Sequence, residues 1–249
     1  SESAFVGMMN ERAAELGMTD THFVNCTGLD DGADASEHLT TAYDIALMSR
    51  ELLKHGEIKK YTTIWMDTVR NGQFGLANTN KLVRFYDGTT GLKTGYTSGA
   101  GYCLSASAER GGMELIAVVM HCDTSPHRFE SAKAMLNYGF SNFALAVPPT
   151  AADIPAVPVV LGHAETVTPI LQSAEPVLID KALASSLSSQ ITVDESVTAP
   201  VEKGQRLGTL TMTAGDRVIA ELPLVAPEAV AALSWWDVFT QMMQKLCMG

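Results

Sequence analysis

Gly-Leu-Lys-Thr-Gly-Tyr-Thr, residues 91–97, and Tyr-Cys-Leu-Ser-Ala-Ser-Ala, residues 102–108, are the stretches that decide the fold. Both are short and rich in β-branched, aromatic and small residues, which favours strands. The second run is either the continuation of the first strand or its partner. Gly111-Gly112 then predicts a tight turn into a third strand, 114–121, whose poor alternation predicts burial on both faces.

Helical patterns lie on both sides of these strands. Residues 4–17 carry apolar side chains at helical spacing, 18–38 reads as a loop, and Thr40 or Thr41 is placed to cap a helix that runs to Leu53. Residues 126–143 predict a third helix. A strand hairpin with a helix packed on it is an α+β arrangement. The inner side of that third helix is expected to carry Phe129, Ala132, Met135, Leu136 and Tyr138.

A cluster of prolines, Pro148, Pro149, Pro155 and Pro158, marks a boundary. Short Val-, Ile-, Leu- and Thr-rich segments separated by Gly, Pro and Asp follow it, which is typical of a small all-β sandwich. The segments are 157–161, 166–171, 176–180, 190–193, 206–213 and 217–225.

The last stretch, 227–247, is helical in period and amphipathic, with apolar residues at three- and four-residue steps that include Leu233, Trp236, Phe239, Met243 and Leu246. We therefore expect three parts: an α+β domain over 1–147, an all-β domain over 148–226 and an amphipathic helix over 227–249.

Composition excludes several classes of function. The chain has 249 residues and a net charge of −11, and phosphate binding needs clustered Lys and Arg, so nucleic acid is not an expected partner. Its histidines show no metal-ligand spacing, and we expect no metal and no cofactor. Four cysteines are too few for a disulfide scaffold. Cys103 and Cys122 could pair, but small buried thiols are the favoured interpretation.

Lys93-Thr94-Gly95 in this setting resembles the active-site strand of the low-molecular-mass penicillin-binding proteins, the serine D-alanyl-D-alanine carboxypeptidases. The similarity extends over nearly the whole chain, including the run Asn78–Leu82 before the strand and His127–Phe140 after it. Residues 1–147 thus resemble part of a penicillin-binding (β-lactamase/transpeptidase-like) domain. Two other parts of the family signature, Ser-x-x-Lys and Ser-x-Asn, occur nowhere in the 249 residues. The resemblance therefore implies the C-terminal part of a carboxypeptidase.

The resemblance assigns roles to five residues. Lys93 would assist proton transfer at the nucleophile and attract the terminal carboxylate of the substrate. The Thr94 hydroxyl would donate a hydrogen bond to that carboxylate. Gly95 would let the substrate backbone lie against the strand. The backbone N–H of Tyr96 would be an oxyanion donor, and Arg128 would stand near the carboxylate pocket. A surface ion pair is the alternative interpretation of Arg128.

The same resemblance implies the partners. These are peptidoglycan stem peptides ending in D-Ala-D-Ala, β-lactams, and the outer face of the cytoplasmic membrane, which the C-terminal helix would hold peripherally. Without the N-terminal segment of the domain, apolar sheet and helix faces would be uncovered. We therefore expect that segment, or another copy of the chain, to cover them.

Two hypotheses of different class remain. The chain belongs to an active carboxypeptidase that forms an acyl-serine, with residues 1–249 lacking the nucleophile and inactive alone, or it is a non-catalytic peptidoglycan-binding or scaffold protein with the same fold. A β-lactamase is a third and weaker alternative, because an appended β domain and a C-terminal helix fit carboxypeptidases better.

Overall fold

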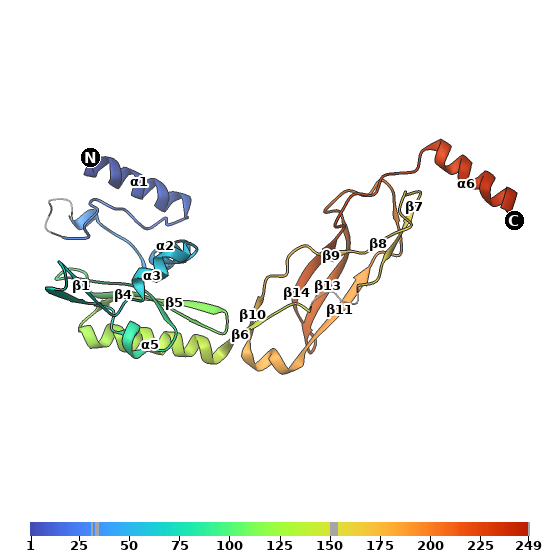
Figure 1. Ribbon diagram of the computed structural model, residues 1–249. Coiled ribbons are helices and arrows are strands. Elements are labelled where there is room, and N and C mark those ends of the chain that lie inside the picture. The colour runs from blue at the N-terminus through green and yellow to red at the C-terminus, as the bar shows by residue number, and fades with distance from the viewer. Residues whose placement is uncertain (31, 33–34, 150–153, 249) are drawn as a thin grey trace. The chain divides into compact units, whose positions relative to one another are not determined.

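The structure is a computed structural model that describes residues 1–30, 32, 35–149 and 154–248. It divides into two compact units, Ser1–Ser141 and Asn142–Gly249 (Figure 1). The first unit mixes helices with a sheet and the second is mainly strands, so the predicted α+β class is confirmed. No helix among the described residues is long and apolar enough to cross a membrane.

The sheet of the first unit contains β3 (Thr89–Thr97), β4 (Gly101–Arg110) and β5 (Met113–Cys122) in that order, all antiparallel. The 102–108 run is therefore the partner of the Lys93 strand and not its continuation, with Lys93 paired to Ser105. Gly111 and Gly112 make the turn into β5 at φ values of 57° and 79°. Glycine adopts such angles without steric cost, which explains the position of the turn.

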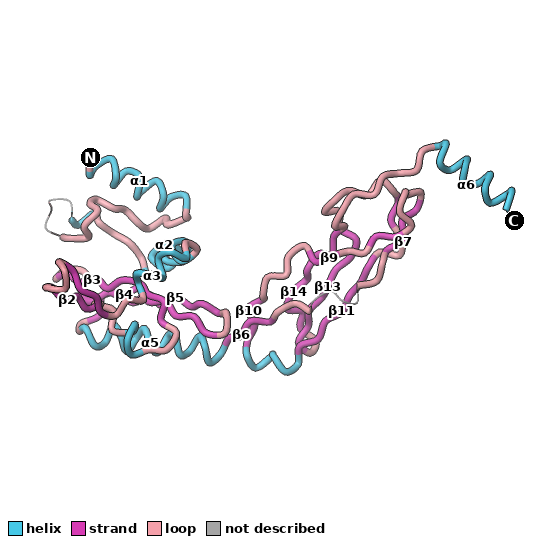
Figure 2. The backbone as a smooth tube through the Cα atoms, in the orientation of Figure 1, coloured by secondary structure: helices cyan, strands magenta, loops and turns pink. Residues whose placement is uncertain are grey.

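Helix α5 (Ser125–Asn142) covers one face of this sheet (Figure 2). Its Phe129, Ala132 and Leu136 pack with side chains of β4 and β5 that include Leu104 and Ala117. Because strand side chains alternate between faces, the remaining strand residues point away from α5.

Two predictions about this layer are wrong. Met135 and Tyr138, expected on the inner side of α5, are exposed. The helix itself, predicted over 126–143, is confirmed to within one residue at each end. On β5, Val118 and Met120 are only partly buried, since the face away from α5 borders an open groove. The strand is thus fully covered on one face only.

Helices and a hairpin surround the sheet. Thr41 caps α2 (Ala42–Leu53) by accepting a hydrogen bond from the N–H of Asp44, which confirms the predicted start of that helix. The loop after α1 is held to α2, since the Asp44 carboxylate accepts hydrogen bonds from the backbone N–H of Asp20 and the Thr21 hydroxyl. The other elements are α1 (Glu2–Glu15), η1 (Ala35–Glu37), η2 (Gly56–Ile58), α3 (Lys59–Thr62), β1 (Met66–Val69), β2 (Phe74–Ala77) and α4 (Leu82–Phe85).

The second unit contains three small sheets with apolar side chains between them. One has the order β11-β13-β14-β9, the second β12-β7-β8, and the third pairs β10 with β6. Its elements are β6 (Phe143–Ala146), β7 (Val157–Val160), β8 (Thr166–Val167), β9 (Ile170–Leu171), β10 (Val177–Asp180), η3 (Lys181–Ser186), β11 (Leu187–Val193), β12 (Val197–Thr198), β13 (Arg206–Ala214), β14 (Arg217–Val225) and α6 (Trp235–Met248). The predicted strands are all present, although the 166–171 segment is two short strands. The β6 strand precedes residue 148, and the domain boundaries given above stay predictions.

The C-terminal helix is shorter than predicted. Helix α6 begins at Trp235, whereas the preceding residues are extended: Val230 bridges to Val201 and Ala232 to Gly162. Val230 is buried in the β core. Some of the regularly spaced apolar residues in 227–247 are therefore apolar because they are buried in the β domain, and not because they lie on one face of a helix. The side chains of Leu246 and Cys247 lie outside the described residues.

The thiols of Cys103 and Cys122 are free and partly buried, as favoured from the sequence. Cys26 is exposed, because it lies on the loop after α1, and the prediction of a buried thiol is wrong there.

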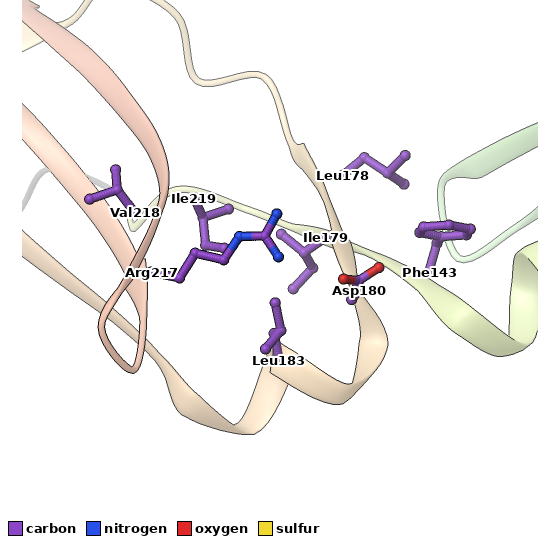
Figure 3. Close-up of a pocket in the computed structure, with 8 residues that line it drawn as sticks. All are labelled: Phe143, Leu178, Ile179, Asp180, Leu183, Arg217, Val218 and Ile219. Atoms are coloured by element: carbon purple, nitrogen blue, oxygen red, sulfur yellow. The ribbon is translucent and has the colours of Figure 1, made fainter.

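The second unit has a shallow hollow between β10, η3 and β14 (Figure 3). The side chains of Arg217 and Asp180 lie there among apolar side chains such as Leu178 and Val218. None of the residues assigned roles from the sequence lies at this hollow.

Several large apolar side chains of the first unit are exposed. On α1, Phe5 and Met8 are 53% and 63% exposed, and they border an apolar hollow of about 290 Å³ together with Phe23 and Met48. Exposed apolar patches of this kind mark surfaces that another segment or molecule covers.

We expect the 249-residue chain by itself to self-associate, because association removes these faces from water. Light scattering after size exclusion should show species above the monomer mass. Replacing Phe5 and Met8 together with Gln should lower the associated fraction, whereas Val218→Gln, at an equally exposed apolar position of the second unit, should not. A stable monomer that binds no apolar dye would contradict this prediction.

Candidate active site

An apolar-walled groove lies on the face of the sheet opposite α5. Side chains of α2 form one wall, β3, β4 and β5 form the floor, and the enclosed volume is about 440 Å³. Lys93, Thr94 and Gly95 all line it, so the structure brings these three predicted residues together at one surface. The remaining lining residues are Thr40, Ile45, Met48, Ser49, Leu52, Leu92, Cys103, Leu104, Ser105, Val118, Val119 and Met120.

The floor of the groove is joined to its wall by polar contacts. The hydroxyls of Ser49 on α2 and Ser105 on β4 are 2.8 Å apart and hydrogen-bonded. Ser105 pairs with Lys93 across the ladder, so this contact lies beside the lysine. This contact is not predictable from the sequence, because nothing local to residues 49 and 105 indicates that they meet.

Lys93 and Thr94 differ in their surroundings. The Lys93 side chain is exposed, and its Nζ donates to the carbonyl oxygen of Thr94 at 2.8 Å. Thr94 is only 8% exposed, and its Oγ1 lies 2.7 Å from the Oγ1 of Thr79. The ammonium is thus placed at the groove surface, while the threonine hydroxyl is turned to Thr79 in the run before α4.

Gly95 has room for a side chain on its own side of the sheet. A Cβ atom built there would meet the Cβ of Cys103 at 3.8 Å, an ordinary van der Waals distance, and the residue does not have a positive φ. The fold therefore does not require glycine at this position.

Tyr96 follows on the exposed end of β3. Its ring packs against that of Tyr102, which pairs with it across the ladder, at a centroid distance of 4.3 Å and a tilt of 32°. The role expected from the sequence involves only the backbone N–H of Tyr96. Such a cross-strand aromatic pair stabilises the end of the hairpin that carries this N–H.

Arg128 is buried, so its interpretation as a surface ion pair is wrong. One guanidinium nitrogen, Nη1, donates to the carbonyl oxygens of Gly95 and Cys103 at 3.0 and 3.3 Å. Burial lowers the pKa of Arg128, although the group remains a cation at neutral pH. Its Nε is buried without a hydrogen-bond partner among the described residues. Arg128 does not line the groove and instead holds the ends of β3 and β4 together.

The described part of the chain contains no group of three or more His, Cys, Asp or Glu side chains that could hold a metal ion. The chemistry that this arrangement offers is a cation at the surface, a buried hydroxyl and a strand at the edge of the sheet. These are features suited to binding a carboxylate-bearing peptide in extended form.

Comparison with protein families accounts for both units. Residues 1–124 match the D-alanyl-D-alanine carboxypeptidase family, and residues 152–232 match the C-terminal domain of penicillin-binding protein 5. The chain belongs to the D-alanyl-D-alanine carboxypeptidase family. Over the part of their length that it spans, the chain matches the low-molecular-mass penicillin-binding proteins in sequence and in fold.

Individual relatives agree with that assignment. The D-alanyl-D-alanine carboxypeptidase DacF of Bacillus subtilis is 37% identical over 92% of this chain and 59% of its own length. A crystal structure of penicillin-binding protein 5 from Haemophilus influenzae aligns with a TM-score of 0.73 at 28% identity, over 91% of this chain and 66% of that one. Penicillin-binding protein D2 of Listeria monocytogenes, in a cefotaxime-bound form, aligns with a TM-score of 0.51 at 36% identity over 55% of each chain. The chain thus spans about three fifths of the curated relative that it matches.

The contacts of Arg128 generate a prediction about the end of β3. Replacing Arg128 with Lys keeps the charge, but a single ammonium cannot reproduce the planar fork that reaches two carbonyls. Hydrogen bonds to charged groups contribute about 1.5–3 kcal/mol. We therefore expect amide hydrogen exchange near residues 95–103 to accelerate about tenfold or more. Arg110→Lys is the control, because Arg110 binds the carbonyl of Asp87 at the opposite end of β4. Equal acceleration in both variants would refute the anchoring role.

Proposed function

We propose that the protein is a serine-type D-Ala-D-Ala carboxypeptidase that trims peptidoglycan stem peptides through an acyl-serine intermediate. In this proposal, residues 1–249 supply the strand side of the cleft and do not contain the nucleophile. The observation that carries it is the position of Lys93-Thr94-Gly95 on the floor of the groove, in a chain that belongs to the carboxypeptidase family.

The substrate would lie in extended form along the free edge of β3. This strand is at one end of the three-stranded sheet, so its outer backbone groups are not used by the ladder. An added strand gains main-chain hydrogen bonds from such an edge. Because Gly95 has no side chain although the fold has room for one, its role is more readily explained by the close approach of a ligand backbone.

The proposed roles combine the family resemblance with the position of each residue. Lys93, exposed at the groove, would attract the terminal carboxylate and assist proton transfer at the serine, and Thr94 would donate its hydroxyl to the same carboxylate. The N–H of Tyr96 would stabilise the oxyanion of the acylation step. Arg128 would act on the carboxylate through its charge, since its guanidinium is directed to the backbone behind the groove.

The substrate and partners are those of the family. They include D-Ala-D-Ala stem peptides and β-lactams, outside the cytoplasm, and the cefotaxime complex of the Listeria protein is consistent with the second. The exposed apolar faces of α1 and the groove would be covered by the N-terminal part of the catalytic domain or by a second copy of the chain.

The expected reaction with benzylpenicillin is a covalent adduct detected by intact mass. The protein as its gene encodes it should gain the mass of one benzylpenicillin, whereas the 249-residue chain alone should gain none. Gly95→Ala should lower the rate of adduct formation at least tenfold while leaving thermal unfolding unchanged. Gly75→Ala, at an exposed strand position with nothing within 4 Å of the added methyl, is the matched control. A folded gene product without an adduct would favour the non-catalytic alternative.

We further propose that α6 attaches the protein peripherally to the membrane. Trp235, Trp236, Phe239, Met242 and Met243 are all exposed on this helix. Amphipathic helices bury such side chains at the lipid interface, where tryptophan is favoured. Ser234 caps the helix, because its Oγ accepts from the N–H of Asp237 and the Asp237 carboxylate accepts from the N–H of Ser234.

Binding to lipid vesicles should depend on apolar burial and not on charge. Helix α6 contains one acidic residue, Asp237, and one basic residue, Lys245, so added salt or anionic lipid should change the bound fraction little. Replacing Trp235, Trp236 and Phe239 with Ser should abolish co-sedimentation with phosphatidylcholine vesicles. Val218→Ser serves as the exposed-residue control. Undiminished binding of the triple variant would exclude α6 as the attachment.

A further inference from the structure

The hydroxyl of Thr94 has a partner outside the Lys-Thr-Gly motif. Its Oγ1 lies 2.7 Å from the Oγ1 of Thr79, a hydrogen-bonding distance for two hydroxyls. Thr79 stands in the run between β2 and α4, which is remote in sequence from the motif. A contact of this kind can set the rotamer of Thr94 and the direction of its proton.

Thr79 itself is rigidly placed by the two asparagines beside it. The Asn78 side-chain amide donates to the carbonyls of Thr62 and Ile64, and its Oδ1 accepts from the N–H of Asn80. Asn80 is 1% exposed. Its amide donates to the carbonyl of Gly91 at 3.1 Å and accepts from the N–H of Leu82. The backbone on both sides of Thr79 is thus tied to β3 and to the end of α3.

Binding of a carboxylate would decide which of the two hydroxyls donates to the other. Each hydroxyl offers one proton and two lone pairs, and either can donate in the free protein. A carboxylate only accepts, so Thr94 can bind it only by turning its own proton toward it. The proton between the two threonines must then come from Thr79, and Thr94 would be acceptor and donor at once, which strengthens both bonds.

We propose that Thr79 is a positioning residue for carboxylate recognition, which holds the Thr94 hydroxyl as a preoriented donor by donating a hydrogen bond to its oxygen. The inference rests on the proposed function for its consequence in catalysis. Its structural part, the fixing of the Thr94 rotamer, holds without any substrate.

The first test compares two peptides with the protein as its gene encodes it. One is an N-acylated tripeptide ending in D-Ala-D-Ala as the free acid, and the other is the same peptide with a C-terminal amide. Thr79→Val keeps the side-chain shape and removes the hydroxyl. A neutral hydrogen bond contributes about 0.5–1.5 kcal/mol, so the ratio of kcat/KM for acid over amide should fall about two- to twelvefold.

Two control variants separate positioning from general damage. Thr79→Ser retains the hydroxyl and should keep the acid preference. Thr68→Val makes the same change at an exposed strand position and should leave kcat/KM for both peptides unchanged. An unchanged ratio in Thr79→Val, or an equal loss for both peptides, would overturn the carboxylate role while leaving the proposed function intact.

The second test needs no turnover. Three-bond couplings to the Thr94 γ-methyl, measured by NMR on the free protein, report its χ1 rotamer. We expect a single rotamer in the wild type and in Thr79→Ser, and averaging in Thr79→Val. A single unchanged rotamer in Thr79→Val would overturn the positioning role. Absence of hydrolysis and of a penicillin adduct in the wild type would count against the proposed function alone, because this measurement is independent of it.

Discussion

Close packing of α5 on one face of the β3-β4-β5 sheet is the constraint on which the site depends. Small residues allow the close approach: Ala106, Ala117 and Ala132 are completely or almost completely buried in this layer. At Gly139, a Cβ would come within 2.4 Å of Cδ1 of Leu115, so a larger residue would require the Leu115 side chain to shift. With one face filled at this density, the alternate residues of the strands are left to form the other face.

That second face carries polar side chains beside the apolar side chains that line the groove. On β4, Leu104 and Ala106 pack toward α5, whereas Ser105 contacts Ser49 of α2. Arg128 is the exception to this separation. It is a buried cation whose charge is compensated by carbonyl oxygens and aromatic rings, with its guanidinium 5.3 Å from the Tyr102 ring and 4.9 Å from that of Phe129. Burying a charge is tolerated when hydrogen bonds replace its water. The buried charge therefore requires the carbonyls of Gly95 and Cys103 to stay in place, which fixes the end of the strands beside the groove.

The type and order of the helices and strands were largely predictable from the sequence, whereas the burial or exposure of individual apolar side chains was not. The cap at Thr41, the Gly111-Gly112 turn and the strands of the second unit follow from local rules of backbone geometry. The errors concern which face an apolar residue occupies. Met135 and Tyr138 satisfy a helical period yet face solvent, and Val230 satisfies the same period yet lies in a β core. The spacing of apolar residues indicates which side chains can be buried, and the neighbouring helices and strands determine which of them are buried.

By itself, the sequence determined the family, the Lys93–Tyr96 strand and the partition into a mixed unit and a β-rich unit, because motif spacing and turn chemistry are local properties. The tertiary structure alone decided that Arg128 binds the carbonyls of Gly95 and Cys103, and that Thr79 meets Thr94. These pairs are far apart in sequence, and their side chains are ordinary in isolation. They become significant only where the fold brings a donor within hydrogen-bonding distance of an acceptor.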